Sequence, residues 1–168
     1  MDLSAKLGKE EPLVLIYHTH GSETYKKVNG KEGSVIEVGT ALTKELENVY
    51  GIKTVHDKSV YDMVDGQLDR NAAYNFAGDS VEAALRKNPS VKVVIDLHRD
   101  SVENNIHLRT KINGKSAAQI MFFNGVSRLA SKGDIGYLYN PNKEANLAFS
   151  LQMQLLCGKY YPDLTRRI

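Results

Sequence analysis

Residues 13–23 read LVLIYHTHGSE, an uninterrupted apolar run followed at once by two histidines, a glycine and a glutamate. A continuous apolar run of this length predicts a strand buried on both faces of a parallel sheet. A second segment has the same design, VVIDLHRD at residues 93–100. Ligands of open parallel sheets bind in the crevice outside the carboxyl ends of the strands. We therefore expect the histidines of the two segments to meet there.

The residues between these two strands predict helices alternating with strands. Apolar residues recur at steps of three and four over residues 35–49, which predicts a helix ending before Gly51. Residues 52–55 are expected to form a strand, and residues 72–85 a second helix that Asn88-Pro89 ends. The order β-α-β-α-β is typical of an α/β fold with a mostly parallel, twisted sheet and helices on both faces.

After residue 100 the pattern changes from alternating elements to a hairpin. Residues 106–112 and 116–123 flank Asn113-Gly114, a dipeptide that strongly indicates a hairpin turn, so an inserted β-hairpin is expected. A last helix is expected from Asn142 to about Tyr160. Leu151 and Leu155 would lie on its buried side.

Composition predicts one globular domain over residues 1–168. The apolar fraction is 42%, and the net charge of +2 comes from 22 basic and 20 acidic residues spread along the chain. No basic stripe is visible, so nucleic acid is not an expected partner. Cys157 is expected to be a small buried core residue. No run approaches about 18 apolar residues, so the chain is expected to be soluble. Because it stops directly after a predicted helix, we expect a C-terminally truncated domain whose final strand is missing.

Histidine and glutamate at these strand ends predict a catalytic zinc site. His20 and Glu23 have the H-x-x-E spacing, which lets an imidazole and a carboxylate approach one cation, and His98 would supply the third ligand. Two histidines and one carboxylate leave a fourth position for water, as in catalytic zinc sites, whereas structural sites fill all four positions and use cysteine. The base rate for isolated histidines places His56 and His107 outside the ligand set.

Four further residues are candidates for the same site. His18 is a rival of His20 as ligand, a catalytic partner that orients a ligand, or a buried histidine satisfied by its own hydrogen bonds. Glu37 is an alternative carboxylate ligand, although a glutamate in the first helical turn is equally explained by the helix dipole. Arg99 could pair with a substrate carboxylate and Asp100 could orient an imidazole, but a surface ion pair between them explains the sequence as well.

The motifs, taken together, resemble the stage II sporulation protein P family along nearly the whole chain. The matching segments are LIYHTHGSETY at residues 15–25, VIEVGTALTKELENVYGI at 35–52, VHDKSVYD at 55–62 and VVIDLHRDS at 93–101. The resemblance implies a zinc-dependent N-acetylmuramoyl-L-alanine amidase with an additional peptidoglycan endopeptidase activity. The resemblance carries over to His18, His20, Glu23, His98, Arg99 and Asp100.

The same resemblance implies a place and partners in the cell. Members of the family act in endospore-forming bacteria with stage II sporulation protein D and other membrane proteins of engulfment. An N-terminal transmembrane helix tethers them outside the cytoplasm, and peptidoglycan is the substrate. An extracytoplasmic, membrane-anchored location is therefore expected for the full-length protein.

One expected element of the family has no counterpart here. Related amidases use a glutamate on a late strand as general base. The acidic residues of this chain after residue 100 are Glu103, Asp134, Glu144 and Asp163, and none of them ends an apolar strand pattern. We expect this glutamate to lie outside the chain, so that residues 1–168 bind zinc but hydrolyse poorly. Two alternatives stay open: a zinc carboxypeptidase or endopeptidase, and a non-catalytic module that binds the cell wall.

Overall fold

The computed structural model describes residues 10–25, 32–103, 106–131 and 133–166. The chain divides into two compact units, one comprising Ala5–Ser101 and the other Val102–Ile168 together with Met1–Ser4. That residues 1–168 form one domain lacking a final strand stays a prediction.

The unit Ala5–Ser101 is built on a three-stranded parallel sheet in the order β2-β1-β5. Its strands are β1 (Val14–Tyr17), β2 (Thr54–His56) and β5 (Val93–Asp96). Strand β1 is central: Ile16 pairs with His56 on one side and with Ile95 on the other. The predicted α/β fold with a parallel sheet is confirmed.

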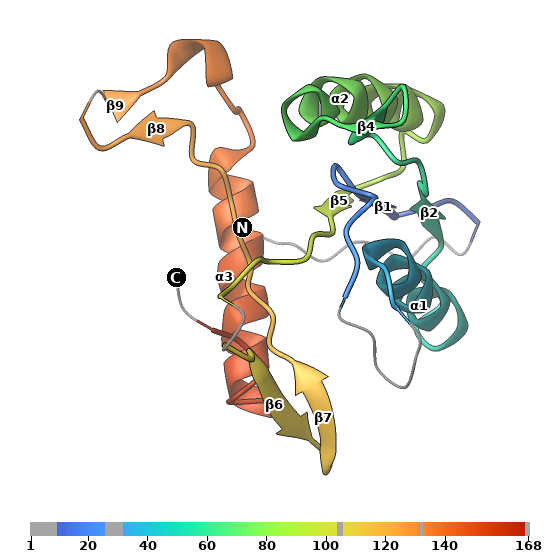
Figure 1. The fold of residues 1–168 in the computed structure, drawn as a ribbon, viewed down its shortest axis with the longest axis vertical. Helices are drawn as coiled ribbons and strands as arrows, with labels where there is room; N and C mark the ends of the chain where they lie inside the picture. Colours follow the sequence, from blue (N-terminus) through green and yellow to red (C-terminus); the bar gives the residue numbers. More distant parts are fainter. Residues whose placement is uncertain (1–9, 26–31, 104–105, 132, 167–168) are drawn as a thin grey trace. The chain divides into compact units, whose positions relative to one another are not determined.

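Two helices connect these strands and begin at well-formed caps. Helix α1 (Val35–Asn48) starts at a capping box between Ser34 and Glu37, and α2 (Arg70–Lys87) starts at Asp69, whose carboxylate accepts from two backbone N–H groups. The first crossover leaves β1 toward β2 and the second passes back to β5, so right-handed connections place the helices on opposite faces. Figure 1 shows α1 and α2 on the two sides of this sheet, as predicted.

The apolar core of this unit lies around β1. The buried apolar residues are Val14, Leu15, Ile16, Val35, Ala73 and Ala77, contributed by β1 and by the inner faces of both helices. Because β1 is covered on both faces, its sequence is a continuous apolar run and does not alternate. The residues that follow β1 are thereby held at the middle of the sheet edge.

A small hairpin between β2 and α2 was not predicted. It pairs β3 (Met63–Val64) with β4 (Gln67–Leu68) around Asp65 and Gly66, whose φ angles are +50° and +78°. Two positive φ angles in a two-residue turn favour Asp-Gly, so the dipeptide was an available signal.

The second unit contains the predicted hairpin. Strands β6 (Arg109–Ile112) and β7 (Lys115–Ala118) pair around Asn113 and Gly114, which have φ angles of +50° and +78°. The unit also contains β8 (Arg128–Leu129), β9 (Gly133–Asp134), the 3₁₀ turn η1 (Gly136–Leu138) and α3 (Lys143–Tyr160).

Helix α3 has the predicted extent but not the predicted burial. Leu151 and Leu155 are 59% and 64% exposed, and Cys157 is half-buried, so the expected buried side and core cysteine are wrong. No residue of α3 is buried, and its apolar residues are spread around the helix and do not form one stripe that a neighbouring element could cover. Among the described residues, no helix combines the length and apolar character needed to cross a membrane.

Candidate metal centre

The candidate centre lies at the carboxyl ends of β1 and β5. The last residues of these neighbouring strands, Tyr17 and Asp96, are paired in the sheet. His20 follows Tyr17 by three residues and His98 follows Asp96 by two, so both imidazoles emerge at one sheet edge. The ring centroids of His20 and His98 are 5.0 Å apart, close enough for both to contact one ion.

His20, Glu23 and His98 form a group suited to a metal ion. One ligand atom from each lies within 4.8 Å of the others. The two carboxylate oxygens of Glu23 lie 3.9 Å from Nδ1 of His20 and 3.9 Å from Nδ1 of His98, respectively. Ligands about 2.0–2.1 Å from a tetrahedral zinc ion stand roughly 3.4 Å apart, so a small contraction satisfies the ion. The donor set fits catalytic zinc.

The surroundings of His20 orient its Nδ1 toward the group. Its Nε2 lies 3.4 Å from the carbonyl oxygen of Arg70, at the start of α2; because a carbonyl oxygen only accepts, this contact favours the proton on Nε2. The ring also meets that of Tyr74 edge to face at a centroid distance of 5.4 Å. Helix α2 thus supports the first ligand.

His98 is oriented in the same sense by a carboxylate. Its Nε2 donates to Oδ2 of Asp96 over 2.8 Å, which leaves Nδ1 for a metal. The hydrogen bond to Asp96 raises the pKa of His98, although burial opposes this. Burial raises the pKa of Asp96, but hydrogen bonds from His98 and Thr19 outweigh it and lower that pKa below its usual value.

Glu23 is the buried carboxylate at the middle of the group. It is 7% exposed, and the backbone N–H of Arg99 donates to its Oε2 over 2.8 Å. Among the described residues, the ionisable partners within 4.0 Å of its oxygens are the imidazoles of His20 and His98. A buried charge requires such partners, and a shared cation satisfies all three side chains.

His18 lies outside this group. Its side chain is 0% exposed, its Nδ1 donates to the carbonyl oxygen of Leu97 over 2.9 Å, and its Nε2 lies 2.9 Å from Nε2 of His56. Burial lowers the pKa of both imidazoles. The structure thus brings His20, and not its rival His18, to Glu23 and His98.

The remaining candidates have other contacts. Glu37 accepts a hydrogen bond from the backbone N–H of Ser34 in the capping box of α1, which is the helix-terminal alternative. Asp100 is exposed, and its carboxylate accepts from the N–H of Ser101. Arg99 donates from Nη1 to the Asp100 carbonyl at 3.4 Å, while its Nε is buried without a hydrogen-bond partner among the described residues.

Two carboxylates of the site escaped the sequence reasoning. Asp96 holds His98 and Thr19, and Asp62 holds Ser22. Asp96 had a visible signal, since it is the charged residue within the apolar run of the second histidine segment. Asp62 ends the segment at residues 55–62 that resembles the family, but nothing local to it indicates its partner 40 positions away.

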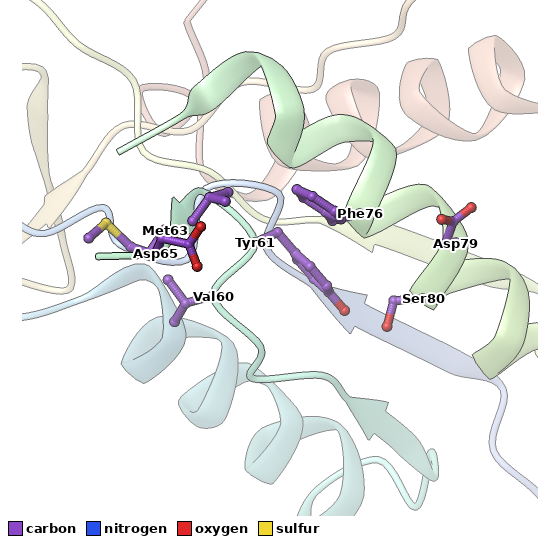
Figure 2. A pocket seen from close by; sticks show the side chains of 8 residues that line it. Val60, Tyr61, Met63, Asp65, Phe76, Asp79 and Ser80 are labelled. Carbon is purple, nitrogen blue, oxygen red and sulfur yellow. The ribbon is translucent and has the colours of Figure 1, made fainter. Parts of the chain in front are cut away.

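A separate hollow lies between residues 60–65 and α2. It measures about 650 Å³ and contains none of His20, Glu23 and His98. Figure 2 shows Tyr61 and Met63 on one wall and Phe76 of α2 on another. Because none of its lining residues is a candidate ligand, this hollow is separate from the candidate centre.

The comparisons with known proteins agree with the motifs. The family model described as Stage II sporulation protein P (SpoIIP) matches residues 2–168. The Stage II sporulation protein P of Bacillus subtilis (strain 168) is 26% identical, over 93% of this chain and 38% of the relative. The chain thus spans well under half the length of that curated relative, and no solved structure matches it. On the match over residues 2–168, this chain belongs to the stage II sporulation protein P family.

Proposed function

We propose that this chain is the metal-binding part of a peptidoglycan hydrolase of sporulation, with zinc held by His20, Glu23 and His98. One observation carries the proposal: two imidazoles each bind an oxygen through Nε2 and direct Nδ1 to a single buried carboxylate. Family membership supports the sporulation setting and the cell wall as the site of action.

The donor set determines the chemistry available at this site. A zinc ion bound here would supply a water of lowered pKa and polarise the carbonyl of an amide, the two effects that amide hydrolysis lacks in bulk water. The Asp96 carboxylate and the Arg70 carbonyl each lie against Nε2 of one imidazole, and Nδ1 of both rings faces Glu23. The backbone N–H of Arg99 holds the Glu23 carboxylate between them.

Arg99 is proposed to bind a carboxylate of the substrate. It follows His98 directly, and its buried Nε lacks a partner among the described residues. Guanidinium groups bind carboxylates through paired N–H donors, and peptidoglycan stem peptides carry carboxylates. The guanidinium would thereby orient the stem peptide beside the metal.

The proposed substrate bond is the amide between N-acetylmuramic acid and L-alanine, and an endopeptidase cut within the stem is the second candidate. Hydrolysis of the first bond frees the amino group of L-alanine, whereas an endopeptidase leaves that group attached to the glycan. Labelling of new amino termini after digestion of purified sacculi, followed by identification of the labelled residue, distinguishes the two activities.

Metal content tests the proposal directly. The purified chain should bind one equivalent of zinc, measured by elemental analysis after dialysis. His98→Ala should lose that zinc, whereas His107→Ala, which changes an exposed histidine of the second unit, should retain it. If the wild-type chain binds sacculi but no zinc, the hydrolase proposal is wrong and the chain is a wall-binding module.

The general base, the partners and the location complete the proposal. With a glutamate beyond residue 168 as base, a longer chain should release stem peptide faster than residues 1–168 at equal zinc content. Equal rates would show that the base lies within residues 1–168.

Stage II sporulation protein D and other engulfment membrane proteins are the proposed partners, at an extracytoplasmic membrane surface.

A further inference from the structure

Two carboxylates, of the half-buried Asp96 and the buried Asp62, hold the segment between His18 and Glu23 in the same manner. Asp96 accepts from the N–H of Thr19 over 2.9 Å and from its Oγ1 over 2.6 Å. Asp62, which is 0% exposed, accepts from the N–H of Ser22 over 3.1 Å and from its Oγ over 2.5 Å. Thr19 directly precedes His20 and Ser22 directly precedes Glu23, so each carboxylate holds the residue before a candidate ligand.

Asp96 differs from Asp62 in one respect. The Oδ2 atom that accepts from Thr19 also accepts from Nε2 of His98 over 2.8 Å. A carboxylate oxygen only accepts, so the proton of neutral His98 lies on Nε2 and the lone pair on Nδ1. That Nδ1 lies 3.9 Å from Oε2 of Glu23, on the side of the candidate ion.

From this geometry we propose that Asp96 is a positioning residue that sets the tautomer of His98 for metal binding. Through Thr19 the same carboxylate also holds the segment that bears His20, so one side chain aligns both imidazoles. The part of this inference that concerns metal binding rests on the proposed function. A carboxylate hydrogen-bonded to a ligating imidazole fixes its orientation and increases its basicity, and losing such a partner lowers metal affinity by roughly 10- to 100-fold.

Asp96→Asn changes this arrangement without removing volume. The N–H of Thr19 donates to Oδ1, so the amide oxygen stays on that side and the new NH2 group faces Nε2 of His98. An amide N–H directed at Nε2 needs an acceptor there, which moves the proton of His98 to Nδ1 and blocks metal binding. Asp62→Asn is the matched control, because it alters the equivalent bonds to Ser22 and leaves the bond between Asp96 and His98 in place.

The experiment measures the tautomer and the zinc affinity separately. Two-bond ¹H–¹⁵N correlation spectra of zinc-free protein labelled at histidine report which ring nitrogen carries the proton, at about pH 9 where imidazoles are neutral. His98→Ala assigns the signal. Competition with a chromophoric chelator gives zinc affinity. Wild type should show His98 protonated on Nε2, Asp96→Asn should show Nδ1 protonation and roughly 10- to 100-fold weaker binding, and Asp62→Asn should keep the wild-type tautomer.

The outcomes separate this inference from the proposed function. Nδ1 protonation in wild-type His98 would overturn the inference without any variant, so it stays testable even if Asp96→Asn does not fold. An unchanged tautomer in Asp96→Asn, or an equal change in both variants, would reduce Asp96 to a support for the segment and overturn the inference. Wild type that binds no zinc, with the tautomer change intact, would refute the proposed metal site and leave Asp96 as the group that sets the His98 tautomer.

Discussion

Nε2 of His18 lies 2.9 Å from Nε2 of His56, beneath helix α1. His18 donates from Nδ1 to the Leu97 carbonyl, so its Nε2 is the acceptor and the Nε2 proton belongs to His56. The remaining nitrogen of His56, Nδ1, is buried without a hydrogen-bond partner among the described residues. Two neutral rings satisfy this arrangement, whereas a proton added to Nε2 of His18 would point its N–H at the N–H of His56.

Gly39 of α1 makes room for this pair of imidazoles, so Gly39→Ala should destabilise the protein. A Cβ at Gly39 would lie 2.6 Å from Nε2 of His56 and 2.7 Å from Nε2 of His18. The crowding should exceed the gain of about 1 kcal/mol in helix propensity and lower the free energy of unfolding by roughly 1–3 kcal/mol. Urea denaturation followed by circular dichroism measures the change.

Gly78 of α2 provides the matched control for that substitution. No heavy atom lies within 4 Å of a Cβ built there, so Gly78→Ala should raise the free energy of unfolding by about 0.5–1 kcal/mol. Equal effects of the two substitutions would contradict the close approach of α1 to the imidazoles.

The histidine pair also predicts that acid destabilises the zinc-free protein. Burial lowers the pKa of His56 and of His18 below the value of 6.5 expected for an unfolded chain. The unfolded state therefore binds protons more readily, so this contribution to stability is complete above pH 6.5 and decreases as the pH falls toward the folded pKa. The pKa of His98 is raised in the folded protein, so its own contribution to the free energy of unfolding increases as the pH falls.

His56→Gln isolates the contribution of the pair. It removes one depressed titration and leaves His98 unchanged, so the free energy of unfolding should fall less steeply than in wild type between about pH 7 and pH 5. Chemical denaturation across this range in the presence of a chelator measures both slopes. Parallel slopes would show that the His56 proton equilibrium is the same in folded and unfolded chains.

Glu23 and Glu37 can be distinguished as ligands by two substitutions. Glu23→Gln should reduce zinc binding more than 100-fold, because it removes the charge that faces both imidazoles. Glu37→Ala should keep the zinc and lower the free energy of unfolding by about 0.5–1 kcal/mol, because it removes half of a capping box. Zinc titration and denaturation of both variants check this; loss of zinc in Glu37→Ala alone would reverse the assignment.

Arg99→Lys tests the proposed substrate contact. The backbone N–H that holds Glu23 is retained, so zinc content should not change, whereas loss of the paired donors should raise KM for soluble muropeptides by about 10-fold. Arg86→Lys, which changes an exposed arginine ion-paired with Glu82, should leave both quantities at the wild-type level. A zinc loss in Arg99→Lys would make the arginine a structural support of the site.

The order of the parallel strands and long helices and the position of the site were determined by sequence alone, because they follow from local patterns; the short β3–β4 and β8–β9 hairpins were not predicted. Continuous apolar runs indicated β1 and β5, three- and four-residue spacing indicated α1, and Asn113-Gly114 indicated the hairpin between β6 and β7. The strand ends then placed His20, Glu23 and His98 at one edge, where the structure brings them together.

Only the tertiary structure decided which of the candidate residues at that edge face the metal group and which have other contacts. The sequence could not choose between His18 and His20, assign Glu37 to a helix cap, or find that Asp96 and not Asp100 holds His98. Glu37 and Ser34 are three residues apart and Asp96 and His98 are two, yet the sequence left both pairings open. The place of His18 depends on contacts with His56 and Leu97, which lie 38 and 79 positions away along the chain. Such contacts are set by the register of β1 against β5 and by the approach of α1 at Gly39, which no local pattern encodes.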